Sequence, residues 1–330
     1  MSTFVSSAAA RAVDTTTDPR WIAIVNRDAT TDGSFYYSVT TTGVYCRPSC
    51  PARHARPEHV QFHLTCEEAE RAGFRPCKRC KPRPPARDAT QTAHADSVAA
   101  HVDALDWAAI TEGLDEYGNA VVPSLLTASE CEALVRMYPD DRVFRSRVVM
   151  GRHGFGQGEY KYFSCPLPSI VQTLRTTLYA HLAPVANGWN ASMNIDVRYP
   201  DDHASFAERC HAAGQSRPTP LLLQYRAGDF NCLHQDLYGE HVFPIQVAFL
   251  LSSPSTDFSG GEFVLTEQRP RMQSRVEVVP LRRGDGVAFA VHTRPVRGTC
   301  SIYRVNMRHG VSRLRSGMRH TMGIIFHDGK

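Results

Sequence analysis

The stretch that decides the fold of the larger part of this chain is PLLLQYRAGDFNCLHQD, residues 220–236. It begins with a β-favouring run, passes through a Gly-containing turn, and ends in a histidine and an aspartate separated by one residue. Further β-favouring runs follow at turn-like intervals, at residues 243–251, 261–267, 275–281, 286–291, 304–311 and 319–326. Short strands separated by Gly- and Pro-rich turns predict a sandwich or a jelly roll.

The His-x-Asp pattern in this stretch indicates a metal site. Non-haem Fe(II) oxygenases hold iron with two His and one carboxylate on one face of the metal, which leaves positions open for co-substrate and O₂. The chain contains three such pairs: His94 with Asp96, His101 with Asp103, and His234 with Asp236. Residues i and i+2 share a face in a strand but diverge on a helix. Because only the third pair lies at the edge of the β-rich region, we predict His234 and Asp236 as iron ligands.

A second metal site is predicted by cysteine spacing. Four of the ten cysteines form two close pairs with 26 residues between them: Cys46-x3-Cys50 and Cys77-x2-Cys80. Thiolates are soft ligands that fill the tetrahedral shell of Zn²⁺, and each tight turn directs two sulfurs to one ion. Zinc also allows so short a segment to fold without a large core. Cys66 lies outside the pattern, and His54 is an alternative ligand that the pattern does not require.

The segment around these cysteines is basic. Residues 46–87 carry ten Lys or Arg against four Glu, a net charge of +6, while the whole chain has +4, so the remainder sums to −2. A compact basic module is typical of proteins that bind phosphate-bearing partners. On charge alone, a merely solvated face remains the other interpretation.

Length and patterning predict two domains with helices between the cysteines and the β-rich region. A chain of 330 residues is too long for one ordinary domain. Thr127 and Glu130 form a capping box before a helix that reaches about Tyr138, and residues 168–186 predict a second helix. We expect an α+β protein with a disordered tail, a zinc-binding domain, a linker with a helix, and a β-rich domain, at residues 1–17, 18–84, 85–112 and 113–330.

The composition excludes several classes of protein. Hydrophobic residues make up 42% and charged residues 21% of the chain, which is typical of globular proteins. No apolar run approaches the roughly 18 residues of a membrane span. Residues 1–17 lack the basic start and apolar stretch of a signal peptide. Ten cysteines without such a signal favour a reducing compartment, so we expect a cytoplasmic protein.

The cysteine segment resembles a known family. TTGVYCRPSCPARHARPEHVQF and EEAERAGFRPCKRC, within about residues 17–85, resemble the N-terminal metal-binding domain of the bacterial Ada protein. The resemblance implies that the first cysteine, Cys46, accepts a methyl group from a DNA methylphosphotriester, in a bacterial, nucleoid-associated protein. It also implies that nearby cations contact the DNA backbone, the candidates being Arg47, Arg53, Arg75, Lys78 and Arg79. Neither a helix-turn-helix regulator nor the Pro-Cys-His-Arg motif of base-methyl transfer follows in this chain.

The β-rich region resembles a second family. QYRAGDFNCLHQD, GGEFVLTE, GDGVAFAVH and NMRHGVSRLRSGMRHTMGIIFHD resemble the double-stranded β-helix (jelly-roll) core of 2-oxoglutarate/Fe(II) dioxygenases, AlkB-like or prolyl-hydroxylase-like, over about residues 115–330. The resemblance implies His309 as the third iron ligand, with His292 or His320 as alternatives. It further implies that Arg319 and Thr321 bind the far carboxylate of 2-oxoglutarate, and that Tyr225 contacts this co-substrate.

Together, the two resemblances imply an enzyme that repairs alkylated DNA. Its cofactors are expected to be Zn²⁺ and Fe²⁺, with 2-oxoglutarate and O₂ as co-substrates and alkylated DNA as the partner. The oxygenase would remove alkyl groups by oxidation, and the zinc-bound cysteine would act as a methyl acceptor. Two alternatives stay open: a hydroxylase of a protein or small molecule that the zinc domain tethers to DNA, and a non-catalytic methylation sensor.

Overall fold

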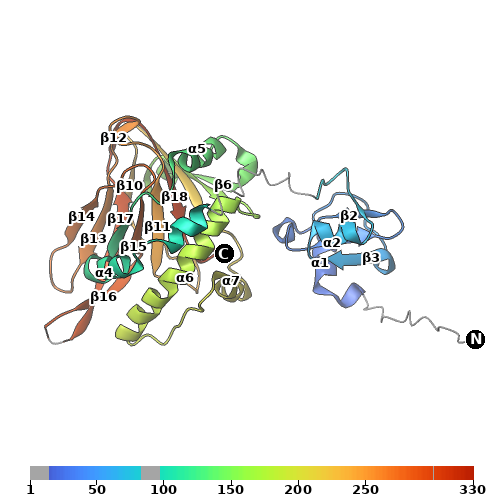
Figure 1. Ribbon diagram of the computed structural model, residues 1–330, viewed down its shortest axis with the longest axis horizontal. Helices are drawn as coiled ribbons and strands as arrows, with labels where there is room; N and C mark the ends of the chain where they lie inside the picture. The colour runs from blue at the N-terminus through green and yellow to red at the C-terminus, as the bar shows by residue number, and fades with distance from the viewer. Residues whose placement is uncertain (1–14, 83–96, 300) are drawn as a thin grey trace, which may run out of the picture. The chain divides into compact units, whose positions relative to one another are not determined.

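The computed structural model describes residues 15–82, 97–299 and 301–330, which form two compact units (Figure 1). The division between the units falls within residues 83–96, outside the described part of the chain. Each unit has its own buried core, so we describe them separately. None of the described helices combines the length and the apolar character needed to cross a membrane.

The first unit is a small four-stranded sheet with two short helices. The strands run in the order β3-β1-β2-β4: Val60–His63, Tyr36–Val39, Val44–Cys46 and Arg75–Pro76. The helices are α1, Pro19–Val25, and α2, Cys66–Arg71. Thr65 caps α2 by accepting a hydrogen bond from the Glu68 backbone, and Gly73 turns the chain away with φ +90°. The four predicted zinc ligands belong to the core of this unit.

The second unit contains two sheets and confirms the expected jelly roll. One sheet has the order β14-β13-β17-β10-β7 with β16 on β17: Arg275–Val279, Phe263–Gln268, Ile302–Val311, Phe230–His234, Gly156–Gln157 and Thr293–Arg297. The other has the order β5-β15-β11-β18-β9-β8-β6 with β12 on β18: Asn119–Val122, Gly286–Ala290, Ile245–Leu250, Leu314–Ile324, Leu221–Arg226, Glu159–Phe163, Phe144–Val149 and Phe258–Gly260. All pairings in the two sheets are antiparallel, which suits a double-stranded β-helix.

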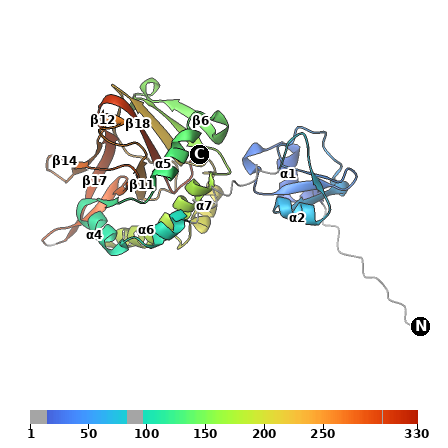
Figure 2. The same cartoon turned by 45° about the horizontal axis from the view of Figure 1, so that its top comes forward.

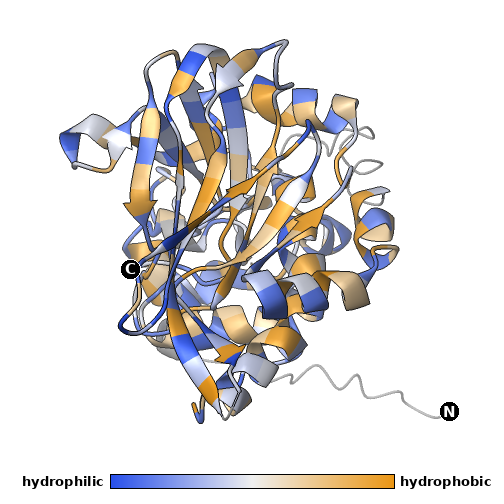
Figure 3. Ribbon diagram, turned by 90° about the vertical axis from the view of Figure 1, so that its left-hand side faces the viewer, coloured by the Kyte–Doolittle hydropathy of each residue, from blue (hydrophilic) through white to orange (hydrophobic). Residues whose placement is uncertain are grey.

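Helices cover the outer face of the larger sheet (Figure 2). They are α4, Trp107–Tyr117, α5, Ala128–Met137, α6, Ser169–Ser192, and α7, His203–Ala212. Thr127 and Glu130 form the predicted capping box at the start of α5. Leu174 and Leu178 of α6 lie in the same buried cluster as Val247 on β11. This cover explains why β11 and β15 are buried on both faces, whereas β13 alternates between buried and more accessible residues. Figure 3 shows that hydrophilic and hydrophobic residues are mixed along several of the strands.

Two differences from the sequence expectation lie in the N-terminal part of the second unit. Residues 97–112, expected as linker and helix, pack into the second unit, because Val98, Val102 and Ile110 are buried in its core. In addition, β6, β7 and β8 extend the sheets although the sequence analysis assigned no strands there. Their sequences, such as EYKYF in β8, mix charged and aromatic residues and so lack clear apolar alternation.

Candidate active site and metal centres

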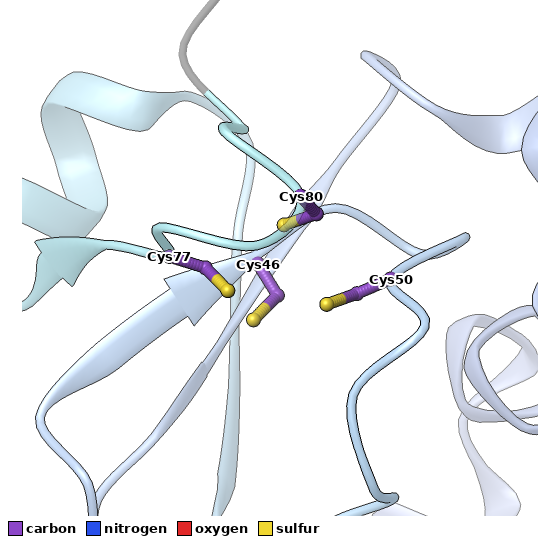
Figure 4. Close-up of side chains that lie close together, drawn as sticks. All are labelled: Cys46, Cys50, Cys77 and Cys80. Atoms are coloured by element: carbon purple, nitrogen blue, oxygen red, sulfur yellow. The ribbon is translucent and has the colours of Figure 1, made fainter.

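Four cysteines converge beside the small sheet of the first unit. Cys46 ends β2, and Cys77 follows β4, the strand that pairs with β2 in parallel. A turn after each of them returns the chain and brings Cys50 and Cys80 to the same place. The four sulfurs lie within 4.8 Å of one another, all four residues are buried, and the side chains point toward a common centre (Figure 4).

The chemistry of this cluster fits Zn²⁺. A hydrogen bond from the Cys46 thiol lowers the pKa of Cys80 to about 5, while the same contact and burial raise the pKa of Cys46. Four thiols that share protons in this way cannot all ionise without a cation to balance their charge. A dication with four soft sulfur ligands in a tetrahedral arrangement supplies that balance, so the residues present fit zinc.

The other polar residues singled out in this unit lie outside the cluster. Cys66 is buried in a separate apolar group with Tyr36 and Tyr45, and His54 is exposed. The candidate DNA contacts are all exposed: Arg47, Arg53, Arg75, Lys78 and Arg79. Arg47 forms an ion pair with Asp32 (3.2 Å), so part of its charge is already compensated.

The second cluster joins His234, Asp236 and His309. His234 is the last residue of β10 and lies directly opposite His309 on the neighbouring strand β17. One Asp236 oxygen is 3.5 Å from His234 Nε2, and the other is 3.4 Å from His309 Nε2. Asp236 lies in the loop beyond β10, so the two residues share a face without forming one continuous strand. Among the described residues, neither His292 nor His320 belongs to a cluster of this kind.

Neighbouring groups fix the orientation and charge of these side chains. The Cys232 carbonyl accepts a hydrogen bond from His234 Nδ1 (2.8 Å), which leaves Nε2 free to bind a metal. Tyr238 donates to Asp236 (2.7 Å). Burial alone would raise the pKa of Asp236. The hydrogen bond to His309 and the charges of the His309 and His234 rings have the opposite, larger effect, so the pKa of Asp236 is lowered. Burial also lowers the pKa of His309 and so favours the neutral imidazole that a metal requires. This donor set fits Fe²⁺.

One pocket connects this cluster with a buried cation. The pocket encloses about 980 Å³, part of it open to solvent, and both the cluster and Arg319 line it. The Arg319 side chain is 1% exposed: its Nη1 donates to Thr321, its Nε has no partner, and none of the described carboxylates forms an ion pair with it. Burial lowers the pKa of Arg319 to about 10, so it stays protonated at neutral pH. A buried guanidinium without a counter-ion fits the far carboxylate of 2-oxoglutarate.

Tyr225 lies beside this cation. It is fully buried on β9, directly opposite Arg319 on β18, and the guanidinium carbon is 5.6 Å from the centre of its ring. Thr321, two residues along β18, lines the same pocket. The structure therefore brings together all three residues predicted to bind the co-substrate. Their roles stay predictions, as do those of the metal ligands.

The pocket also contains a polar residue, Gln246, that the sequence analysis did not assign. Gln246 is 4% exposed on β11, and its amide nitrogen has no partner among the described residues. Its strand is buried throughout, so no polar pattern marked it. Tyr160, Tyr162 and Tyr238 line the pocket as well, whereas the neighbouring Phe163 is buried in the core. The hydrogen bond from Tyr238 to Asp236 could have been predicted from the sequence, because the two residues are only two positions apart.

Comparison with known proteins now identifies the second unit. A family profile described as "Oxygenase, catalysing oxidative methylation of damaged DNA" matches residues 158–329, just over half of the chain. This chain belongs to that oxygenase family. An uncharacterized protein of Mycobacterium tuberculosis (strain H37Rv) is 48% identical to the oxygenase over 166 residues, which is 50% of this chain and 71% of the relative. The expected enzyme class, an oxidoreductase, is confirmed.

The first unit of the oxygenase matches a second profile, the metal binding domain of Ada, over residues 19–83. The bifunctional transcriptional activator and DNA repair enzyme Ada of Escherichia coli K12 is 55% identical over 67 residues, 20% of this chain and 19% of Ada. A 2OG-Fe(II) oxygenase-family oxidoreductase of Burkholderia pseudomallei is 16% identical and covers 68% of this chain and 94% of its own, with a TM-score of 0.42. The expected cofactors are Zn²⁺ for the first unit and Fe²⁺, 2-oxoglutarate and O₂ for the oxygenase unit, as these families imply.

A substitution in either cluster should remove the metal of that cluster and leave the other metal bound. We expect His309→Ala to abolish Fe²⁺ binding and retain zinc, and Cys50→Ser to lose zinc and retain Fe²⁺, because each cluster lies within one unit. Metal content after anaerobic reconstitution, measured by mass spectrometry, checks both. His292→Ala is the matched control and should retain both metals. Full iron content in His309→Ala would show that another residue is the ligand.

Arg319→Gln should weaken 2-oxoglutarate binding by roughly 10- to 100-fold, because a charge-assisted hydrogen bond contributes about 1.5–3 kcal/mol. The measurement is anaerobic calorimetric titration of the iron-loaded protein. Arg315→Gln removes an exposed arginine from the same strand and should leave the affinity unchanged. Equal affinities for the two variants would exclude Arg319 as the carboxylate partner.

Proposed function

We propose that this oxygenase removes methyl groups from bases in DNA by oxidation. The observation that carries the proposal is the pocket that joins the cluster of His234, Asp236 and His309 to Arg319 and to several tyrosines. Arg319 is a buried cation that forms no ion pair with any described carboxylate. The family to which the chain belongs is described as acting on damaged DNA. In the proposed role, the three clustered residues hold Fe²⁺, while Arg319, with Thr321 and Tyr225, holds 2-oxoglutarate.

The direction of the reaction follows from its chemistry. Iron with 2-oxoglutarate and O₂ supplies an oxidant that places one oxygen atom into a C–H bond and yields succinate and CO₂. On an N-methyl group, the product is N–CH₂OH, whose C–N bond breaks to release formaldehyde and leave N–H. Oxidation at such a carbon therefore removes the methyl group.

In the proposed role, tyrosines of the pocket orient the metal ligand Asp236 and the base. Tyr238 donates a hydrogen bond to Asp236 and so holds its carboxylate in place. Burial, and to a lesser extent the charge of Asp236, raises the pKa of Tyr238, so its hydroxyl stays protonated and remains a hydrogen-bond donor. The rings of Tyr160 and Tyr162 meet edge to face, with centres 5.3 Å apart, and both line the pocket. In the proposed role, these aromatic walls contact the base.

We further propose that Cys46 accepts methyl groups from DNA methylphosphotriesters. The sulfur would attack the methyl carbon, forming an S–CH₃ bond while the C–O bond breaks and a phosphodiester anion leaves. Four thiolates around Zn²⁺ carry a net charge of −2, which keeps a sulfur nucleophilic. The exposed cations of this unit would hold the DNA backbone: Arg47, Arg53, Arg75, Lys78 and Arg79. Such a protein would work in the cytoplasm of a bacterium, at the nucleoid.

The first test is formaldehyde release from oligonucleotides that carry one N-methylated base. We expect the iron-loaded protein to release formaldehyde only with 2-oxoglutarate, and His234→Ala to lose at least about 100-fold in rate, since a missing metal ligand removes the reaction centre. Succinate formation without formaldehyde would contradict dealkylation of DNA and favour a peptide or small-molecule substrate. If neither product forms, the catalytic proposal fails and the sensor alternative gains support.

Intact-mass spectrometry tests the second activity. After exposure to DNA with methylphosphotriesters, we expect a gain of about 14 Da, one CH₂, by thiolate alkylation. Peptide fragmentation should place it on Cys46. Cys46→Ser should lose the gain, while Cys66→Ser, a buried cysteine outside the cluster, should retain it. A methyl group found on Cys50, Cys77 or Cys80 would contradict the assignment.

A further inference from the structure

An exposed phenylalanine lies at the opening of the active-site pocket. Phe155 belongs to the segment 150–158 between β6 and β8, and it lines the pocket that contains the iron-ligand cluster. Nonetheless, its side chain is 48% exposed, and it is the only phenylalanine among the exposed large hydrophobic residues that the structure describes. A residue that is both exposed and part of the pocket wall marks the place where a substrate enters.

The segment is held against the strand that carries His234. Its strand β7 pairs with β10, and the Phe155 carbonyl accepts a hydrogen bond from the Cys232 backbone (2.9 Å). Gly156 permits this contact, because at φ +130° an added Cβ would lie 2.3 Å from the Phe230 carbonyl oxygen. The backbone of Phe155 is therefore fixed relative to the iron-ligand cluster.

The fold gains little from this side chain. Phe155 belongs to none of the described hydrophobic core clusters. Its ring stacks on His153, which is also exposed, with centres 5.3 Å apart and an angle of 22° between the planes. Two flat rings thus stand next to each other at the surface, with the exposed Arg152 preceding them. Stacked aromatic surface beside a cation suits nucleic-acid bases and their phosphates.

A base in duplex DNA must leave the helix to reach the proposed iron site. Asp236 and His309 are only 8% and 7% exposed, so the reacting group has to enter the pocket. Rotation of a base out of the helix loses its stacking and pairing, and proteins offset that loss by inserting an apolar side chain into the gap. The inserted group must be exposed, apolar, fixed in position and next to the pocket.

We propose that Phe155, supported by His153, is the wedge that enters duplex DNA when the methylated base rotates into the pocket. The ring of Phe155 takes the stacking position that the base leaves. Tyr160, Tyr162 and Tyr238 then surround the rotated base inside the pocket. This inference rests on the proposed function and adds duplex DNA as the substrate form that requires Phe155.

The test compares duplex and single-stranded forms of one methylated oligonucleotide, using the full chain. Phe155→Ala should lower the ratio of kcat/KM on duplex to kcat/KM on single strand by roughly 5- to 100-fold, the range that corresponds to loss of one base–aromatic stack. Phe155→Trp should restore the ratio. Met272→Ala, which removes another exposed apolar side chain, should leave it unchanged. An unchanged ratio in Phe155→Ala would overturn the proposal.

A second readout does not depend on turnover. A duplex with 2-aminopurine beside the methylated base should become more fluorescent when the iron-loaded protein binds it without O₂, because unstacking relieves quenching. Phe155→Ala should lose most of this increase. Equal increases for both proteins, or no increase with the unsubstituted protein, would contradict the wedge even if formaldehyde is released. Absence of formaldehyde together with a Phe155-dependent increase would instead contradict the proposed function alone.

Discussion

The pairing of β10 with β17 is the constraint on which the oxygenase site depends. Asn231 lies opposite Val311, but His234 lies opposite His309, so the register shifts within β10. Such irregularities bend a strand and redirect its side chains, and they are frequent next to active sites. The shift lies beside Cys232. The carbonyl oxygen of Cys232 accepts a hydrogen bond from the His234 ring, and its backbone N–H donates a hydrogen bond to the carbonyl oxygen of Phe155. One local departure from regular pairing thus positions both His234, a predicted metal ligand, and the segment that contains Phe155.

The parts of the sites that could be predicted from sequence are those made by local spacing or by a resemblance. Cys46 with Cys50, and Cys77 with Cys80, are each close in the chain, so a turn alone brings the two sulfurs together. By contrast, His309 lies on a strand distant in sequence from His234. Its choice over His292 and His320 came from the resemblance, because periodicity does not reveal which strands become neighbours.

Other features could not be predicted because tertiary contacts create them. Gln246 lies in a strand buried on both sides, and only the position of the pocket makes its amide accessible to a ligand. Phe155 lies between two glycines in a segment that resembles an ordinary loop. Residues 97–112 join the core of the oxygenase unit because Val98, Val102 and Ile110 find a buried surface there, although their composition also suits a linker.

The two proposed activities suit two chemically different kinds of methyl damage. A methyl group on a phosphotriester has a stable leaving group, the phosphodiester anion, so a thiolate such as Cys46 can remove it without an oxidant, at the cost of one protein per methyl. A methyl group on a base nitrogen has no such leaving group, and its removal requires oxidation of the carbon. In the proposed function, the buried Arg319, which forms no ion pair with any described carboxylate, would serve the removal of the base lesion, because it would hold the co-substrate that makes repeated turnover possible.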